Sequence, residues 1–241
     1  RKIKTMEKIG IIGLGNMGMG IAKNVIKGGY TAVGYDLREE CLKEIVSHGG
    51  EAAESVSQVS QLSDVVFVMV MNGKQVKEVV TQLSPGLKDR GTIIITATTK
   101  PEEVKEAYKI AQKNNINMVD SPVSGGLQGA HEGTLTLMTA ADEKTLQDCK
   151  KILESISKNM IHVGTNIGDG QTVKASLQSF IGATFTAIFE SLVLGSKAGI
   201  NGQILYDVIS ASGASSPLFK YCAKLIMDRK FETTGSHIST M

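Results

Sequence analysis

The stretch with the clearest chemical character lies near the start of the chain, where three glycines follow an apolar run. It reads Gly13, Leu14, Gly15, Asn16, Met17 and Gly18. In this G-x-G-x-x-G spacing, the first glycine permits a tight turn and the second leaves space for a phosphate to approach the backbone. The third allows a helix to pack closely on the preceding strand. The free N–H groups and the positive dipole end of that helix attract a phosphate, so the stretch predicts a phosphate-binding turn.

The flanking residues strengthen this prediction. The apolar residues 9–12 are typical of a strand, and the apolar spacing of residues 19–26 is typical of a helix. Asp36 ends a second apolar run at about the distance where an acid accepts hydrogen bonds from the ribose of a dinucleotide. A carboxylate there repels a 2′-phosphate, which favours NAD. Arg38 could neutralise such a phosphate, so NADP remains the alternative.

The rest of residues 7–140 alternates between strand-like and helix-like segments. Residues 64–70, 92–96, 117–120 and 134–138 are predicted strands, and the segments between them carry helical spacing. This alternation predicts an α/β fold of the Rossmann type, with a doubly wound parallel sheet. Ligands of such sheets bind at the carboxyl ends of the strands. Four polar side chains lie just after predicted strands: Asp36, Asn72, Thr98 and Ser124.

Composition excludes several classes of protein. The chain has 241 residues, of which 41% are hydrophobic and 21% charged, and a net charge of +2. That charge is too small to suggest a nucleic-acid surface. The three cysteines and four histidines are scattered, which argues against a disulfide framework and a metal site. We therefore expect a cytoplasmic protein without a bound metal.

The character of the chain changes after a glycine-rich segment at residues 164–170. Residues 171–199 contain no proline and only three charged side chains, Lys174, Glu190 and Lys197. A helix that is apolar nearly all round is usually buried among other helices. Polar residues interrupt it, so we do not expect it to span a membrane. We expect a dinucleotide-binding domain at residues 1–168 and an all-helical domain at 169–241, which forms a homodimer or homotetramer through its apolar surface.

Two groups of residues could act on a substrate. Lys174 lies in the first turns of the apolar helix, where burying a charge is costly, and Gln178 lies one turn later on the same side. Ser124 precedes Gly125 and Gly126, so a hydroxyl and bare N–H groups could hold a carboxylate. From the residues alone, a side chain that extends to solvent is the more ordinary explanation for Lys174, and a plain turn after a strand explains Ser124 equally well.

Four segments of the chain together resemble the β-hydroxyacid dehydrogenases, a family that includes 3-hydroxyisobutyrate dehydrogenase, tartronate semialdehyde reductase and L-threonate dehydrogenase. The second and fourth segments are the more specific ones. The segments are Gly13-Leu-Gly-Asn-Met-Gly18, Asp120-Ser-Pro-Val-Ser-Gly-Gly126, Gly133-Thr-Leu-Thr136 and Gly164-x3-Gly168-x-Gly170-x3-Lys174.

The resemblance implies a role for each candidate residue. Lys174 would be the catalytic lysine, and Ser124, Gly125 and Gly126 would hold the carboxylate of the substrate. Thr98 would lie beside the nicotinamide ribose. The loop Val70, Met71 and Asn72 would pass the cofactor, although the family usually has Leu-Pro-Asn there.

Two further departures bear on function. The family usually has asparagine four residues after the lysine, whereas Gln178 resembles the L-threonate dehydrogenase branch and favours a polyhydroxy acid. Family members also continue for some tens of residues and carry a Lys-Asp pair there. We therefore expect the helical domain to be truncated relative to theirs.

The expected activity is NAD-dependent oxidation of the hydroxyl of a small hydroxy acid, such as L-threonate or 3-hydroxyisobutyrate, with a lysine as general acid and base. One alternative is an NADPH-dependent reductase of tartronate, glyoxylate or succinic semialdehyde. Another is a non-catalytic nucleotide-binding protein on the same scaffold. We expect neither a nucleic-acid partner nor a membrane partner.

Overall fold

A computed structural model describes residues 8–89 and 91–231, and the chain divides into two compact units between Ala175 and Ser176. The strands are β1 (Lys8–Ile12), β2 (Thr31–Tyr35), β3 (Glu51–Ala52), β4 (Val65–Val68), β5 (Thr92–Ile95), β6 (Asn117–Asp120), β7 (Val123–Ser124), β8 (Leu135–Ala140) and β9 (Ser157–Gly164). The helices are α1 (Asn16–Lys27), α2 (Glu39–Ser47), α3 (Val56–Leu62), α4 (Gly73–Leu83), α5 (Pro101–Lys113), α6 (Gly126–Glu132), α7 (Glu143–Ile156), α8 (Asp169–Lys197), α9 (Gly202–Ala211) and α10 (Pro217–Met227).

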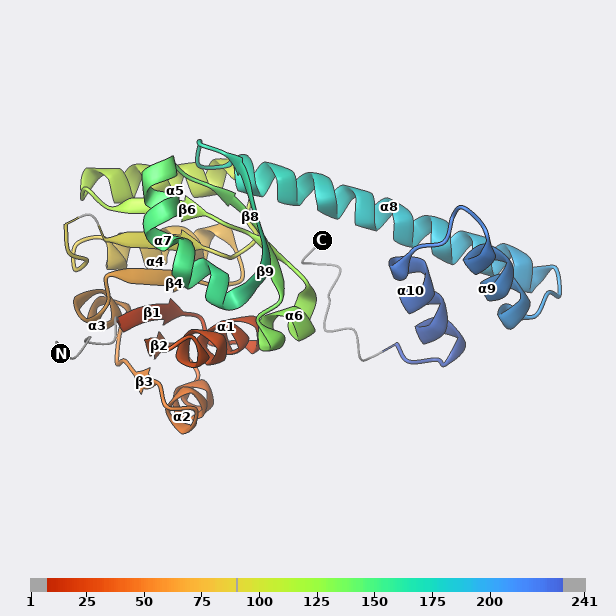
Figure 1. Ribbon diagram of the computed structural model, residues 1–241, viewed down its shortest axis with the longest axis horizontal. Coiled ribbons are helices and arrows are strands. Elements are labelled where there is room, and N and C mark those ends of the chain that lie inside the picture. The colour runs from red at the N-terminus through yellow and green to blue at the C-terminus, as the bar shows by residue number, and fades with distance from the viewer. Residues whose placement is uncertain (1–7, 90, 232–241) are drawn as a thin grey trace. The chain divides into compact units, whose positions relative to one another are not determined.

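The first unit is built on one sheet with helices on both faces (Figure 1). The first six strands lie in the order β3-β2-β1-β4-β5-β6, and all neighbours in this part are parallel. This is the order of a dinucleotide-binding Rossmann sheet, whose strand order reverses beside β1. The predicted fold class, an α/β sheet followed by helices, is confirmed.

The far edge of the sheet differs from the expectation of a purely parallel arrangement. The strand predicted at residues 134–138 exists as β8, but it runs antiparallel to both β6 and β7. The helix between β7 and β8 is short and does not cross the sheet, because α6 packs instead on α1, where Gly20 lies against Ala130. Parallel neighbouring strands need a connection that crosses over the sheet, whereas the connection from β7 to β8 does not cross it.

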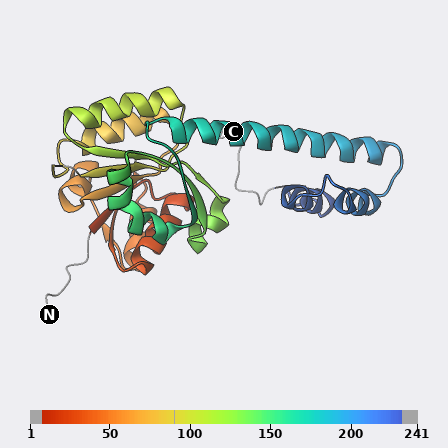
Figure 2. The same cartoon turned by 45° about the horizontal axis from the view of Figure 1, so that its top comes forward.

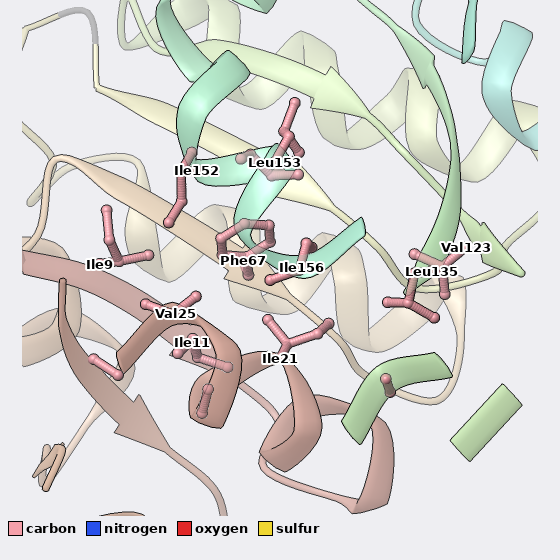
Figure 3. Close-up of a cluster of buried hydrophobic side chains, with 14 of the residues drawn as sticks. Ile9, Ile11, Ile21, Val25, Phe67, Val123, Leu135, Ile152, Leu153 and Ile156 are labelled. Atoms are coloured by element: carbon pink, nitrogen blue, oxygen red, sulfur yellow. The ribbon is translucent and has the colours of Figure 1, made fainter. Parts of the chain in front are cut away.

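Two hydrophobic clusters cover the opposite faces of the sheet. In β1, Ile11 belongs to the cluster with α1 and α7, whereas Ile12 belongs to the cluster with α3, α4 and α5. Figure 3 shows the first cluster, in which Phe67 of β4 lies among Ile21 of α1 and Ile156 of α7. Successive side chains of a strand point to opposite faces, so a strand with both faces covered is apolar throughout.

The second unit consists of the later part of α8 together with α9 and α10 (Figure 2). Its core contains Ile188 and Leu192 of α8 and Phe219 and Ala223 of α10. By length and composition, α8 could also cross a membrane, since an 18-residue window reaches a mean hydropathy of 1.5. Core helices of water-soluble proteins satisfy the same criteria.

Candidate active site

The glycine-rich turn connects β1 to α1, and its glycines are needed for different reasons. Gly13 has φ +90°, and a Cβ there would overlap the carbonyl oxygen of Met69. A Cβ on Gly18 would overlap the carbonyl oxygen of Gly13. A Cβ on Gly15, by contrast, would have Nη2 of Arg38 as its nearest neighbour, at 3.5 Å. The turn is therefore tight where it contacts the protein and open at the glycine where a pyrophosphate would approach.

Asp36 follows β2 and is hydrogen-bonded to the glycine-rich turn. Its Oδ2 accepts a hydrogen bond from the backbone N–H of Leu14 at 2.8 Å. Arg38 binds both carboxylate oxygens, with Nε donating to Oδ1 at 3.0 Å and Nη2 donating to Oδ2 at 3.1 Å. Burial raises the pKa of Asp36, but these hydrogen bonds outweigh it and hold the pKa below its usual value. Asp36 is thus an ionised group that both shapes the turn and holds Arg38.

The loop after β4 lies beside the glycine turn. Its residue Met69 donates a backbone hydrogen bond to the carbonyl of Ile12, and Val70 is half-buried. Met71 is 73% exposed. The side chain of Asn72 accepts a hydrogen bond from the backbone N–H of Gln75 at 3.0 Å and so caps α4. Because the Asn72 oxygen is used for this cap, contacts of the loop with a cofactor would come mainly from its backbone.

Two further groups lie at the carboxyl ends of strands. Thr98 is exposed in the loop that follows β5. Ser124 ends β7, opposite Thr136 of β8, and is half-buried. Gly125 and Gly126 are exposed and have φ values of +126° and +61°, which other residues rarely adopt. The sequence Ser-Gly-Gly therefore forms a turn whose shape depends on both glycines.

Lys174 lies on α8, in the part that belongs to the first unit, and its side chain is buried. The residue is 8% exposed, and none of the described acidic residues forms an ion pair with it. Burial lowers the pKa of the Lys174 ammonium, because desolvation disfavours the charged form. An unpaired cation in such a place is costly, and perturbed groups of this kind cluster at functional sites. Gln178 follows one turn later on α8 and is half-buried.

A buried polar cluster that sequence reasoning did not single out holds the start of α8. Asp120, at the end of β6, is 0% exposed, and its Oδ2 accepts hydrogen bonds from the backbone N–H groups of Gly168 and Gln171 at 2.9 and 3.2 Å. Gln171 Nε2 donates to Asp120 Oδ1 at 2.9 Å and to the carbonyl of Ala97 at 3.1 Å. Gln171 Oε1 accepts from the backbone N–H of Thr99 at 2.9 Å. The two residues thus connect α8 with the loop that carries Thr98.

The pKa of Asp120 reflects two opposing effects. Burial raises it, and hydrogen bonds from Gln171, Gly168 and Gly170 lower it; burial has the larger effect, so the pKa is raised to about 6. An acid at the end of an apolar strand was visible in the sequence, but its partners lie about 50 residues away along the chain. Among the residues that the structure describes, no three His, Cys, Asp or Glu side chains are placed to hold a metal ion.

The fold and the glycine turn define a protein that binds a dinucleotide. Comparison with family models agrees: residues 8–164 match the NAD-binding domain of 6-phosphogluconate dehydrogenase, and residues 168–241 match the NAD-binding domain of NADP-dependent 3-hydroxyisobutyrate dehydrogenase. The chain belongs to the β-hydroxyacid dehydrogenase family and is an NAD(P)-dependent dehydrogenase. The predicted family, enzyme class and cofactor class are confirmed.

Individual relatives support the family without fixing the substrate. The chain is 34% identical to 2-(hydroxymethyl)glutarate dehydrogenase from Eubacterium barkeri, over 93% of this chain and 75% of that protein. It is 31% identical to L-threonate dehydrogenase from Cupriavidus necator, over 89% of this chain and 73% of that protein. A crystal structure of 3-hydroxyisobutyrate dehydrogenase from Salmonella typhimurium has a TM-score of 0.84 and 28% identity, covering 93% of this chain and 80% of that one.

The observed geometry fits the dinucleotide that the family binds. The space above Gly15 would admit a pyrophosphate, and the first N–H groups of α1 have no partner within the helix. Asp36 and Arg38 lie where the adenosine ribose would be expected.

Proposed function

We propose that this chain oxidises the hydroxyl group of a small hydroxy acid, resembling L-threonate or 3-hydroxyisobutyrate, and transfers the hydride to NAD. Lys174 acts as the general base, and Gln178 orients the hydroxyl oxygen. Ser124, with the backbone of Gly125 and Gly126, holds the substrate carboxylate. In this division of roles, residues 1–168 bind the dinucleotide, and residues 169–241 contribute the remainder of the substrate site.

One observation supports this proposal above the others: Lys174 is a buried ammonium without an ion-pair partner among the described side chains. A protein that only binds a nucleotide has no need of such a costly group. Desolvation lowers the pKa of Lys174 and brings it nearer the pH at which a general base works best. A substrate carboxylate or hydroxyl would give this cation the partner that the described side chains do not supply.

The residues divide the chemical task between them. The bound dinucleotide supplies the hydride acceptor. Neutral Lys174 takes the proton from the hydroxyl oxygen as the carbon–hydrogen bond breaks, and an amide at Gln178 holds that oxygen in line. The Ser124 hydroxyl and the two following N–H groups fix the carboxylate end of the substrate, which aligns its carbinol carbon. In the opposite direction, protonated Lys174 returns the proton to the carbonyl oxygen.

A substrate panel tests the activity and the choice of acid. Initial rates of NADH formation with L-threonate and 3-hydroxyisobutyrate, and of NADH consumption with tartronate semialdehyde, should show the highest kcat/KM for L-threonate. The reason is Gln178, whose extra methylene relative to asparagine displaces the amide by about one bond length and changes which hydroxyl it holds. A clear preference for 3-hydroxyisobutyrate would contradict this assignment, and no turnover with any acid would favour the nucleotide-binding alternative.

The cofactor preference depends on Asp36 and Arg38. We propose that the wild-type chain prefers NAD, because the Asp36 carboxylate repels a 2′-phosphate and also occupies the guanidinium of Arg38. Asp36→Asn keeps an oxygen for the Leu14 N–H but removes the charge and releases Arg38. We expect it to lower the KM for NADP by about 10-fold, a change of about 1.4 kcal/mol in binding.

The control for this experiment is the double variant Asp36→Asn/Arg38→Ala. It lacks both the repulsion and the released guanidinium, so it should lose most of the gain in NADP affinity. An unchanged KM for NADP in Asp36→Asn would remove the role assigned to Asp36. A wild-type chain that already prefers NADPH and reduces a semialdehyde would support the reductase alternative instead.

We further propose a cytoplasmic homodimer or homotetramer that assembles through the helical part. The second unit carries a set of exposed apolar side chains: Phe180, Phe189, Val193, Leu194, Ile204, Val208, Tyr221 and Phe231. Exposed patches of this kind mark association surfaces. Sedimentation at micromolar concentration should give at least twice the monomer mass, whereas a monomeric mass would contradict the proposal. The three cysteines are free and buried, which suits a reducing compartment.

A further inference from the structure

We propose that Asp120 and Gln171 act as a pair of positioning residues, which fix the first turn of α8 on the sheet and so set the place and direction of Lys174. This inference rests on the proposed function insofar as it assigns Lys174 the proton transfer. The sequence pattern of the two residues does not indicate this role, but the hydrogen bonds that they share do.

Asp120 serves the start of α8 purely as an acceptor. Its carboxylate accepts from the N–H groups of Gly168 and Gln171 on Oδ2 and from Nε2 of Gln171 on Oδ1, and the backbone of Gly170 adds a further hydrogen bond. The N–H groups at a helix start have no partner within the helix, so a buried start needs an external acceptor. A strand residue supplies that acceptor here, in place of a capping side chain from the helix itself.

The orientation of the Gln171 amide is fixed by the backbone around it. Its Nε2 must face the carbonyl of Ala97, and its Oε1 must face the N–H of Thr99, because backbone groups cannot exchange donor for acceptor. The remaining hydrogen on Nε2 therefore always points at Asp120. All the groups that face Asp120 are donors, so the residue at position 120 must offer only acceptors. An amide there would place its NH2 group against one of these donors.

The helix itself connects this cluster to the lysine. Gln171 and Lys174 are three residues apart on α8, so their side chains lie on neighbouring positions of one face. The helix start also approaches the sheet closely, since a Cβ on Gly170 would lie 2.7 Å from the carbonyl oxygen of Met138 and 2.9 Å from that of Asp120. The first turn is bonded to Asp120 of β6 and to the loop after β5, and we expect these bonds to set the direction in which Lys174 leaves the helix.

The same cluster fixes the loop that follows β5. Gln171 is bonded to Ala97 and Thr99, the two neighbours of Thr98. A residue that holds both the start of α8 and this loop keeps a fixed distance between Lys174 and Thr98, the residue expected beside the nicotinamide ribose. Displacement of a reacting group by about 1 Å can cost roughly 100-fold in rate.

The test compares Asp120→Asn, Gln171→Glu and the double variant Asp120→Asn/Gln171→Glu. Each single variant should lower kcat by about 100-fold and change the KM for NAD by less than about 3-fold, because the pyrophosphate turn is untouched. Gln171→Glu places two carboxylates together. In the double variant, the amide introduced at position 120 can donate to the carboxylate introduced at position 171, which still accepts from Thr99. The kcat of the double variant should therefore recover by at least about 10-fold over that of Gln171→Glu.

Asp142→Asn is the matched control. Asp142 also accepts a hydrogen bond from a helix start, through Oδ1 and the N–H of Thr145 of α7, but it lies outside the candidate site. Asparagine caps helices about as well as aspartate, so kcat should remain within about 2-fold of the wild-type value. Thermal unfolding of all variants shows whether the rates are measured on folded protein.

Two measurements separate this inference from the proposed function. Amide hydrogen exchange at residues 168–172 should accelerate by about 10-fold or more in Asp120→Asn, whichever acid is the substrate. Unchanged exchange would overturn the inference, as would wild-type kcat in Asp120→Asn alongside an inactive Lys174→Met. If Lys174→Met itself retains turnover, the proposed role of Lys174 fails, and so does a catalytic role for the residues that position it. Faster exchange in Asp120→Asn would then still show that Asp120 holds the helix start.

Discussion

Replacement of Lys174 by methionine is expected to lower kcat for oxidation of the hydroxy acid by about 100- to 10,000-fold, the usual contribution of a general base. Methionine has a similar length and no charge, so it fits the buried position and removes the cost of desolvating the ammonium. The thermal midpoint should therefore not fall. The KM for NAD should change little, because the glycine turn and Asp36 are unaffected.

The pH dependence gives a second measure of the same residue. In the wild-type chain, kcat for oxidation should rise with pH through the pKa of Lys174, which burial places below its usual value. Stability should change in the same direction: the folded state gives up this proton more readily than the unfolded state, so the free energy of unfolding rises as pH passes from the lowered pKa to the usual one. The Lys174→Met variant should lose both pH effects.

Lys151→Met is the control for this substitution. Lys151 is exposed on α7, outside the candidate site, and its replacement should leave kcat within about 2-fold of the wild-type value. A further check is chemical rescue, since added ethylamine should restore part of the activity of Lys174→Ala but not that of Lys174→Met. Retention of more than about a tenth of the wild-type kcat in Lys174→Met would contradict a base at this position.

The second large effect is expected at Gly15. A Cβ at this position meets only Nη2 of Arg38, at 3.5 Å, and the backbone angles of φ −63° and ψ −175° are open to alanine. Gly15→Ala should therefore fold normally. Its methyl group would occupy the space of the pyrophosphate, and overpacking of this kind costs about 1–3 kcal/mol. Calorimetric titration should show a Kd for NAD raised by roughly 5- to 150-fold.

Gly18→Ala serves as the contrasting variant, because its Cβ would overlap the carbonyl oxygen of Gly13 within the turn itself. We expect this variant to lose stability as well as NAD affinity, with a lower thermal midpoint. Equal loss of stability in Gly15→Ala would mean that Gly15 is needed for the turn and not for the ligand. Unchanged NAD affinity in a folded Gly15→Ala would place the pyrophosphate elsewhere.

Local patterns in the sequence predict much of the fold. The unbroken apolar run of β4 and the helical spacing after the glycines predict a buried parallel sheet with flanking helices, because both periodicities reflect which faces are covered. The position of Asp36 after β2 follows from the same local spacing. The apolar composition of residues 171–199 likewise predicts a long helix, which the structure shows as α8.

What the sequence left open concerns partners that are distant along the chain. Its patterns did not indicate that β8 would run antiparallel to β6, since strand direction depends on whether the connection crosses the sheet. They did not predict α7 or β9 as elements of the first unit. They suggested that Lys174 was costly to bury, but they could not exclude a side chain that reaches solvent.

By itself, therefore, the sequence determined the glycine turn, the acid at the end of the second strand and the run of strands and helices that supports them. Only the tertiary structure decided that Lys174 is buried, that Arg38 is held by Asp36, and that Asp120 meets Gln171. Local spacing fixes which face a side chain shares with its neighbours. Which acceptor meets which donor depends on strand order and helix docking, and those contacts join segments that the sequence keeps far apart.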